Sequence, residues 1–119
     1  MQPGLLPLFP LQVVLLPGSE LPLHIFVDRY KEMMAEVMRD RIEFGVILAS
    51  DKGIANTGCT ATVERVLRRY PDGRMDIMTQ GRRRFEIVRL DDEHPEGEPP
   101  NDLVHEANGR ILVADVVDL

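Results

Sequence analysis

The sequence predicts a mainly β fold with one helix, in which about six or seven mostly antiparallel strands form a barrel-like sheet. Apolar and polar residues alternate over most of the chain, which is the period of half-buried strands. Only residues 29–40 show the spacing of an amphipathic helix. The length of 119 residues suits a single domain, 1–119, and 44% hydrophobic content can build a core without disulfides or metal.

The first 27 residues are short apolar pieces interrupted by proline. Proline lacks an N–H and fixes φ, so Pro7 and Pro10 predict edge strands and extended loops. Pro17-Gly18 predicts a turn. A strand follows in which two sets of side chains alternate: Leu21, Leu23 and Ile25 on one face, and Pro22, His24 and Phe26 on the other.

One helix is predicted behind Asp28, whose carboxylate is a candidate N-cap. An apolar stripe follows at helical spacing and ends in Arg41; its members are Tyr30, Met33, Met34, Val37 and Met38. Methionines at this spacing fill a core more often than they line a binding surface, so we interpret the stripe as core.

The period returns to two after the helix. Ile42 to Leu48 predicts a strand, residues 51–58 a turn-rich loop, and Cys59 to Tyr70 a strand whose phase slips near Val66-Leu67, as at a β-bulge. Pro71-Asp72-Gly73 predicts a hairpin turn. Three further strands are expected: from Met75 to a break at Gly81, from Phe85 to Leu90, and a buried one from Ile111 to Leu119.

Charge is distributed unevenly along the chain. The net charge is −6, yet residues 65–89 carry an excess of five positive charges and residues 91–119 an excess of eight negative ones. Solvated faces of opposite sign are the ordinary interpretation. The acidic, breaker-rich segment 91–109 predicts a long loop that is either mobile or functional. The overall charge argues against general attraction to nucleic acid or anionic membranes.

The N-terminus lacks targeting signals. Apolar residues 5–16 are interrupted by proline, and no basic residue precedes Arg29, so a signal peptide is not predicted. No apolar run approaches the roughly 18 residues of a membrane span. With one thiol, Cys59, and no signal, we expect a cytoplasmic protein.

Motifs that carry chemistry are missing from the sequence. It contains no phosphate-binding loop, GxSxG, HExxH or CxxC pattern, so we expect no enzyme activity, no cofactor and no metal. His94 and His105 lie in the acidic segment, where solvated histidines are a better interpretation than a metal site. Cys59 occupies an apolar strand position and predicts a buried, inert thiol rather than a nucleophile.

Two features remain: the proline-framed N-terminal block and the tract Gly81-Arg82-Arg83-Arg84-Phe85. The block resembles the opening of the amino-terminal domain of the ATP-dependent Lon protease family, through Leu6–Leu11 (LPLFPL), Val14–Gly18 (VLLPG), Leu21–Phe26 (LPLHIF) and Arg29–Tyr30. Phe44-Gly45-Val46 and the glycine-arginine-phenylalanine tract lie where that family has similar segments. The resemblance covers residues 5–90 and resumes at 111–119.

The resemblance implies a PUA-like pseudo-β-barrel with one helix, in agreement with the pattern of the residues. It also implies a role without catalysis: recognising and holding protein substrates and contributing to assembly with other Lon subunits. The family's ATPase and its serine–lysine peptidase are separate domains. The sequence departs from the family at Val27-Asp28, in the acidic segment, and in lacking the following helical segment after Leu119. We expect either a piece of a Lon protease or a stand-alone Lon-domain protein.

Two functions remain open from the sequence. The first is binding of unfolded or exposed apolar polypeptide, for which Pro22, His24, Phe26 and Tyr30 are candidates; Phe26 and Tyr30 are alternatively a staple between helix and sheet. The second is RNA binding through the basic tract Arg82, Arg83 and Arg84, against which the negative net charge and the 5% aromatic content argue. A hydrolytic activity has no supporting constellation.

Overall fold

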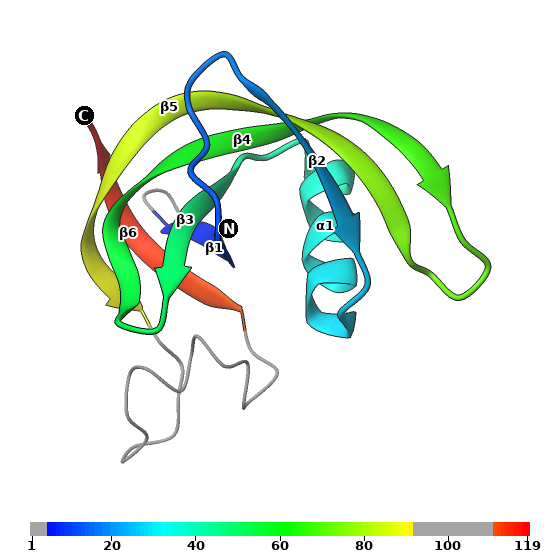
Figure 1. The fold of residues 1–119 in the computed structure, drawn as a ribbon, viewed down its shortest axis with the longest axis horizontal. Helices are drawn as coiled ribbons and strands as arrows, with labels where there is room; N and C mark the ends of the chain where they lie inside the picture. The colour runs from blue at the N-terminus through cyan, green and yellow to red at the C-terminus, as the bar shows by residue number, and fades with distance from the viewer. Residues whose placement is uncertain (1–4, 92–110) are drawn as a thin grey trace.

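The computed structural model describes residues 5–91 and 111–119. Figure 1 shows one helix beside a strongly curved sheet. The elements in chain order are β1 (Leu5–Leu11), β2 (Glu20–Ile25), α1 (Asp28–Asp40), β3 (Phe44–Ser50), β4 (Gly53–Arg69), β5 (Met75–Asp91) and β6 (Leu112–Asp118). Among the described residues, no helix is long and apolar enough to cross a membrane.

The six strands form one sheet in the order β2-β5-β4-β3-β1-β6, and β5 also pairs with β6. This additional pairing closes five of the strands into a ring, and β2 extends the sheet beside the first half of β5. Among the described strands, only β1 and β3 run parallel, and the remaining pairs are antiparallel. The predicted mainly β fold with one helix is confirmed.

The core has two parts. The larger lies between α1 and the sheet, and Tyr30, Met33, Met34 and Val37 are its buried helical residues, as the stripe predicted. The smaller consists of residues from the ring strands: Leu6, Leu8, Ile47, Phe85, Leu112 and Ala114. The larger core holds the helix start against β1 and β2, where the candidate residues lie.

The helix itself is correctly predicted, but its cap is not. Val27 is the N-cap residue and no side chain caps the helix, whereas Asp28 is already helical and forms an ion pair of 3.4 Å with Lys31. Asp28 lies one position after the N-cap, in the first turn, so its negative charge still interacts favourably with the positive end of the helix dipole. At the other end Arg41 adopts the left-handed conformation, with φ of 54°.

Three predicted boundaries in the strands are wrong. β1 is not an edge strand, because it pairs with β6 through Leu5–Leu8 and with β3 through Leu8–Leu11. Each half of β1 has one partner strand, so Pro7 is paired only with β6 and Pro10 only with β3. The expected loop at 51–58 is reduced to a turn at 51–52, because pairing with β3 draws the polar residues that follow into β4. β5 runs unbroken through Gly81.

The hairpin and bulge predictions are confirmed. β4 and β5 meet at the predicted turn, where Gly73 has φ of 93° and donates to the carbonyl of Tyr70 at 3.0 Å. The register shifts between Val66 and Arg68, where the phase slip was expected, and at two earlier points of β4. In β6 only the first half is buried, since Val117 is exposed. The acidic segment with its two histidines lies outside the described residues.

Candidate functional site

An apolar groove lies where the end of β1, the end of β2 and the start of α1 meet. Its volume is about 200 Å³, and three of the four candidate residues line it: His24, Phe26 and Tyr30. The other lining residues are apolar: Phe9, Pro10, Leu11, Leu23, Ile25 and Val27. The fourth candidate, Pro22, is exposed on the same strand but does not line the groove.

The two candidate aromatics occupy opposite environments. Phe26 is 60% exposed, whereas Tyr30 is only 6% exposed and stacks on Phe9 with ring centroids 4.3 Å apart. The alternation predicted for β2 is present, with Ile25 buried and Pro22 exposed like Phe26. Tyr30 therefore fastens the helix to β1, and Phe26 is not part of that staple.

β2 leaves one edge open beside the groove. Among the described strands it pairs only with β5. The carbonyl of Leu21 points toward β5, where it accepts a hydrogen bond of 2.6 Å from Thr79 Oγ1. Because backbone groups of successive residues point to alternate sides, Pro22 and His24 direct theirs to the outer edge. Pro22 has no N–H, so His24 supplies a donor and an acceptor at the position nearest the groove.

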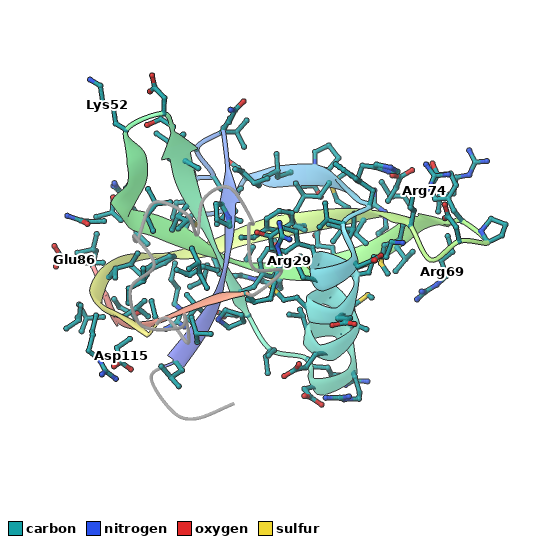
Figure 2. All side chains as sticks on the ribbon, turned by 90° about the horizontal axis from the view of Figure 1, so that it is seen from below. Arg29, Lys52, Arg69, Arg74, Glu86 and Asp115 are labelled. Carbon is teal, nitrogen blue, oxygen red and sulfur yellow. The ribbon has the colours of Figure 1, made fainter. Side chains whose placement is uncertain are left out.

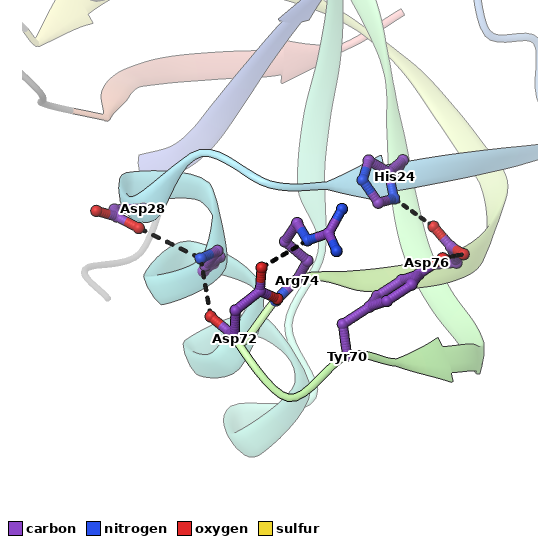
Figure 3. Close-up of polar contacts among 7 residues, drawn as sticks. His24, Asp28, Tyr70, Asp72, Arg74 and Asp76 are labelled. Carbon is purple, nitrogen blue, oxygen red and sulfur yellow. Dashed lines mark hydrogen bonds and ion pairs between the residues drawn. The ribbon is translucent and has the colours of Figure 1, made fainter.

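A hydrogen-bonded cluster orients His24 at the side of the groove (Figure 3). His24 Nδ1 lies 2.5 Å from Asp76 Oδ1, and the Tyr70 hydroxyl donates to Asp76 Oδ2 at 2.8 Å. These two hydrogen bonds lower the pKa of the Asp76 carboxyl, and the bond to Asp76 raises the pKa of Tyr70. The His24 ring in turn stacks near Phe26, with centroids 5.6 Å apart.

Basic side chains continue this cluster toward the hairpin. The guanidinium groups of Arg68 and Arg74 lie 4.7 and 4.5 Å from the centre of the Tyr70 ring. Arg74 Nε donates to Asp72 at 2.8 Å, and Lys31 of α1 donates to the Asp72 carbonyl at 3.2 Å. The hairpin is thereby joined to the helix start (Figure 3), so the elements around the groove hold one another in place.

The glycine and the phenylalanine of the basic tract have structural roles. Gly81 N–H donates to the Ser19 carbonyl at 2.8 Å, and a Cβ at Gly81 would lie 2.3 Å from the Leu16 carbonyl oxygen. Phe85 is fully buried, and its Cζ would lie 2.9 Å from a Cβ at Gly45 and 2.8 Å from one at Gly58. Gly81 thus admits the loop between β1 and β2, and Phe85 occupies space that the two other glycines leave.

The arginines of the tract make local contacts. Arg83 pairs with Glu43 at 2.9 Å and with Asp118 at 2.7 Å, and these carboxylates raise its pKa. Arg82 Nε donates to Thr62 Oγ1 at 3.0 Å, and Arg84 borders a small apolar hollow. The two carboxylates neutralise the middle of the predicted basic patch Arg82–Arg84, so the geometry does not favour phosphate binding there.

The cysteine and the potential metal ligands give no sign of chemical reactivity in the described residues. Cys59 is buried, and its burial raises the pKa of the thiol, which disfavours the reactive thiolate. Among residues 5–91 and 111–119, no group of three or more His, Cys, Asp and Glu side chains could hold a metal ion.

Several residues that shape the groove were not predicted. Phe9 belongs to the opening motif, but its stacking against Tyr30 was not predicted. Tyr70 and Asp76 flank the hairpin turn, and their contact with His24 joins residues about 50 positions apart in sequence. No local periodicity signals such a contact. The one available hint was the tyrosine directly before the turn.

Comparison with known proteins now gives the family. Residues 5–116 match the family described as the ATP-dependent protease La (LON) substrate-binding domain. The chain belongs to the Lon substrate-binding domain family. It is 34% identical over 96 residues to the Lon protease of Roseiflexus castenholzii and 30% identical over 99 residues to that of Parabacteroides distasonis. The aligned parts cover 74% and 76% of this chain but only 12% of each of those proteins.

Solved structures share the fold of this Lon-family domain. The crystal structure of a Lon N-terminal domain protein from Xanthomonas campestris matches this chain with a TM-score of 0.75 and 29% sequence identity. The matched part covers 96% of this chain and 59% of the chain from Xanthomonas campestris. The N-terminal domain of Mycobacterium avium complex Lon protease has a TM-score of 0.64 at 16% identity, over 97% of this chain and 54% of its own. The resemblance seen in the opening motif is confirmed.

Proposed function

We propose that this Lon-family domain binds exposed apolar polypeptide segments in the groove between β1, β2 and α1, and holds them for ATP-dependent proteolysis by other domains. The domain itself is non-catalytic in this proposal. Its family is described by substrate binding, and the relatives named above are Lon proteases. Contact with other Lon subunits and a cytoplasmic location stay predictions of the sequence.

The observation that carries the proposal is the exposure of Phe26. A phenylalanine that leaves 60% of its surface in water, on the border of an apolar groove, stabilises the folded chain little where it stands. An incoming apolar side chain would cover it. Unfolded polypeptides expose such side chains, whereas most folded proteins bury them.

The open edge of β2 supplies the second half of the proposed interaction. An extended segment can pair with the outer edge through the N–H and carbonyl of His24, and place alternate side chains over Phe26 and the groove. Backbone pairing does not depend on sequence, so affinity would follow the apolar content of the segment rather than a motif. Pro22 limits the pairing to a short stretch because it offers no N–H.

The test compares two exposed apolar residues of similar accessibility. Phe26→Ala removes the exposed aromatic ring of the groove, and Val88→Ala removes a side chain of β5 that is 64% exposed and does not line the groove. Binding of a fluorescently labelled, permanently unfolded polypeptide is followed by anisotropy. Covering about half of the exposed surface of Phe26 contributes about 1–2 kcal/mol, so Phe26→Ala should weaken binding about tenfold and Val88→Ala should leave it unchanged. Equal affinities for both variants would refute the proposal.

A further inference from the structure

A second groove lies at the opposite end of α1, between the C-terminal end of the helix and β4. Its volume is about 430 Å³, roughly twice that of the first groove between β1, β2 and the start of α1. The apolar lining comes from both elements: Val37, Met38, Ile42, Val63 and Val66. Val37 is buried and the others are half-buried, so their uncovered parts form a continuous apolar surface.

Two arginines border this groove from opposite elements. Arg41 follows the last turn of α1 in the left-handed conformation, and Arg65 lies on β4 next to the register shift after Val63. Both are exposed. Within the described part of the chain, neither forms an ion pair, whereas Arg39, Arg74, Arg83 and Arg89 each pair with a carboxylate.

Among the described residues, Glu64 is the one acidic residue that lines the groove. The neighbouring carboxyl of Glu20 raises the pKa of Glu64. Two arginines and one glutamate give the lining a net positive charge, although the whole chain has a net charge of −6.

We propose that this α1–β4 groove is a second docking surface, and that its partner is an acidic amphipathic polypeptide segment. Apolar side chains of that segment would cover the surface around Val37 and Val63, and its carboxylates would pair with Arg41 and Arg65. Charge complementarity of this kind selects the partner, while the apolar contact supplies affinity. The inference does not rest on the proposed function, because the two grooves share no lining residue.

A phosphate-bearing partner fits this surface less well. Nucleic acids gain affinity from many cations along a groove, and here two arginines border an apolar surface. A basic segment is disfavoured by the same two arginines. The negative net charge of the chain also opposes any general attraction of an acidic segment, so its binding would have to come from this local surface.

The experiment uses two synthetic peptides with identical leucines on one helical face and either glutamate or lysine on the other. Affinities are measured by anisotropy for the wild type, for Arg41→Asn/Arg65→Gln and for Arg69→Gln. Asparagine tolerates the left-handed conformation of position 41. Arg69 is another exposed arginine of β4, without an ion pair to any described residue, that lies outside the groove and near the hairpin tip in Figure 2.

The acidic peptide should bind the wild type and Arg69→Gln equally, and the double variant about tenfold more weakly, as expected for the loss of two exposed ion pairs. Arg65→Glu should shift the preference toward the lysine peptide. Amide shifts on binding should map to residues 37–42 and 62–66. Tighter binding of the lysine peptide to the wild type, an equal loss in Arg69→Gln, or no binding of the acidic peptide would overturn the proposal. So would a single-stranded RNA oligonucleotide that binds more tightly than the acidic peptide and depends on the same two arginines.

Discussion

Replacing the two groove aromatics one at a time separates scaffold from binding surface. Phe26→Ala and Tyr30→Ala remove rings only four positions apart in sequence, from the same groove. Sequence alone left open whether the pair staples the helix to the sheet. The structure assigns that contact to Tyr30 and Phe9, so the two substitutions should have very different effects on stability.

The expected magnitudes follow from burial. An enclosed phenylalanine buries roughly 200 Å², and Phe26 with 60% exposure has about two-fifths of that covered. At about 25 cal/mol per Å² this is at most about 2 kcal/mol, and the retained Cβ and a compact unfolded chain reduce it to about 1 kcal/mol. Tyr30 is 6% exposed and stacked on Phe9, so its loss should cost about 3–5 kcal/mol.

Urea unfolding measures both values. With a slope of roughly 1–3 kcal/mol per M, Tyr30→Ala should lower the midpoint by about 1 M or more, and Phe26→Ala by a fraction of that. An equal slope for all three proteins is needed to compare the midpoints. If Phe26→Ala lost as much stability as Tyr30→Ala, Phe26 would be part of the scaffold, and its proposed role in binding would end.

Four further outcomes are expected. Gly81→Ala should cost about 1–3 kcal/mol in urea unfolding, because its Cβ would collide with the Leu16 carbonyl. Asp76 has a lowered pKa from its hydrogen bond with His24, so it stabilises the fold above about pH 4 and loses this as pH falls; Asp76→Asn should flatten the acid limb of stability against pH. Through Arg82–Arg84, RNA should bind no more tightly than about 10⁻⁴ M at physiological salt, and a salt-sensitive low-micromolar complex would contradict this. The purified chain should show neither peptidase nor ATPase turnover in assays repeated across successive columns.

Features with a local cause were predictable from the sequence. The helix follows from apolar residues three and four apart, and Gly73 in its turn follows from the Pro-Asp-Gly sequence. Alternation along β2 placed Phe26 on the face opposite Ile25, but whether the helix or solvent covers that face was settled only by the structure. For each feature that was predicted, the deciding residues lie within a few positions of one another.

Features with a distant cause were not predictable. Glycine has a low strand propensity, so Gly81 predicted a break, yet β5 continues through it. The residue is glycine because the loop at Leu16 passes too close for any side chain. The glycine serves a close backbone approach, which periodicity cannot reveal. The polar residues after Asp51 likewise join β4 because β3 provides a partner for pairing. Both errors arise from preferring local propensity to tertiary pairing.

The exposure of Phe26 is imposed by the fold rather than being incidental. Its neighbour Ile25 is buried, so reversing the faces of β2 would place Phe26 in the core and Ile25 in water. His24 lies on the same face of β2 as Phe26 and is held there by its hydrogen bond with Asp76 on the paired strand β5. Phe26 directly follows the last paired residue, so the β2–β5 pairing up to Ile25 and the His24–Asp76 contact set the face from which the chain enters it. An aromatic ring that is mostly exposed at the border of an apolar groove favours a role in contact with another molecule over a role in stability.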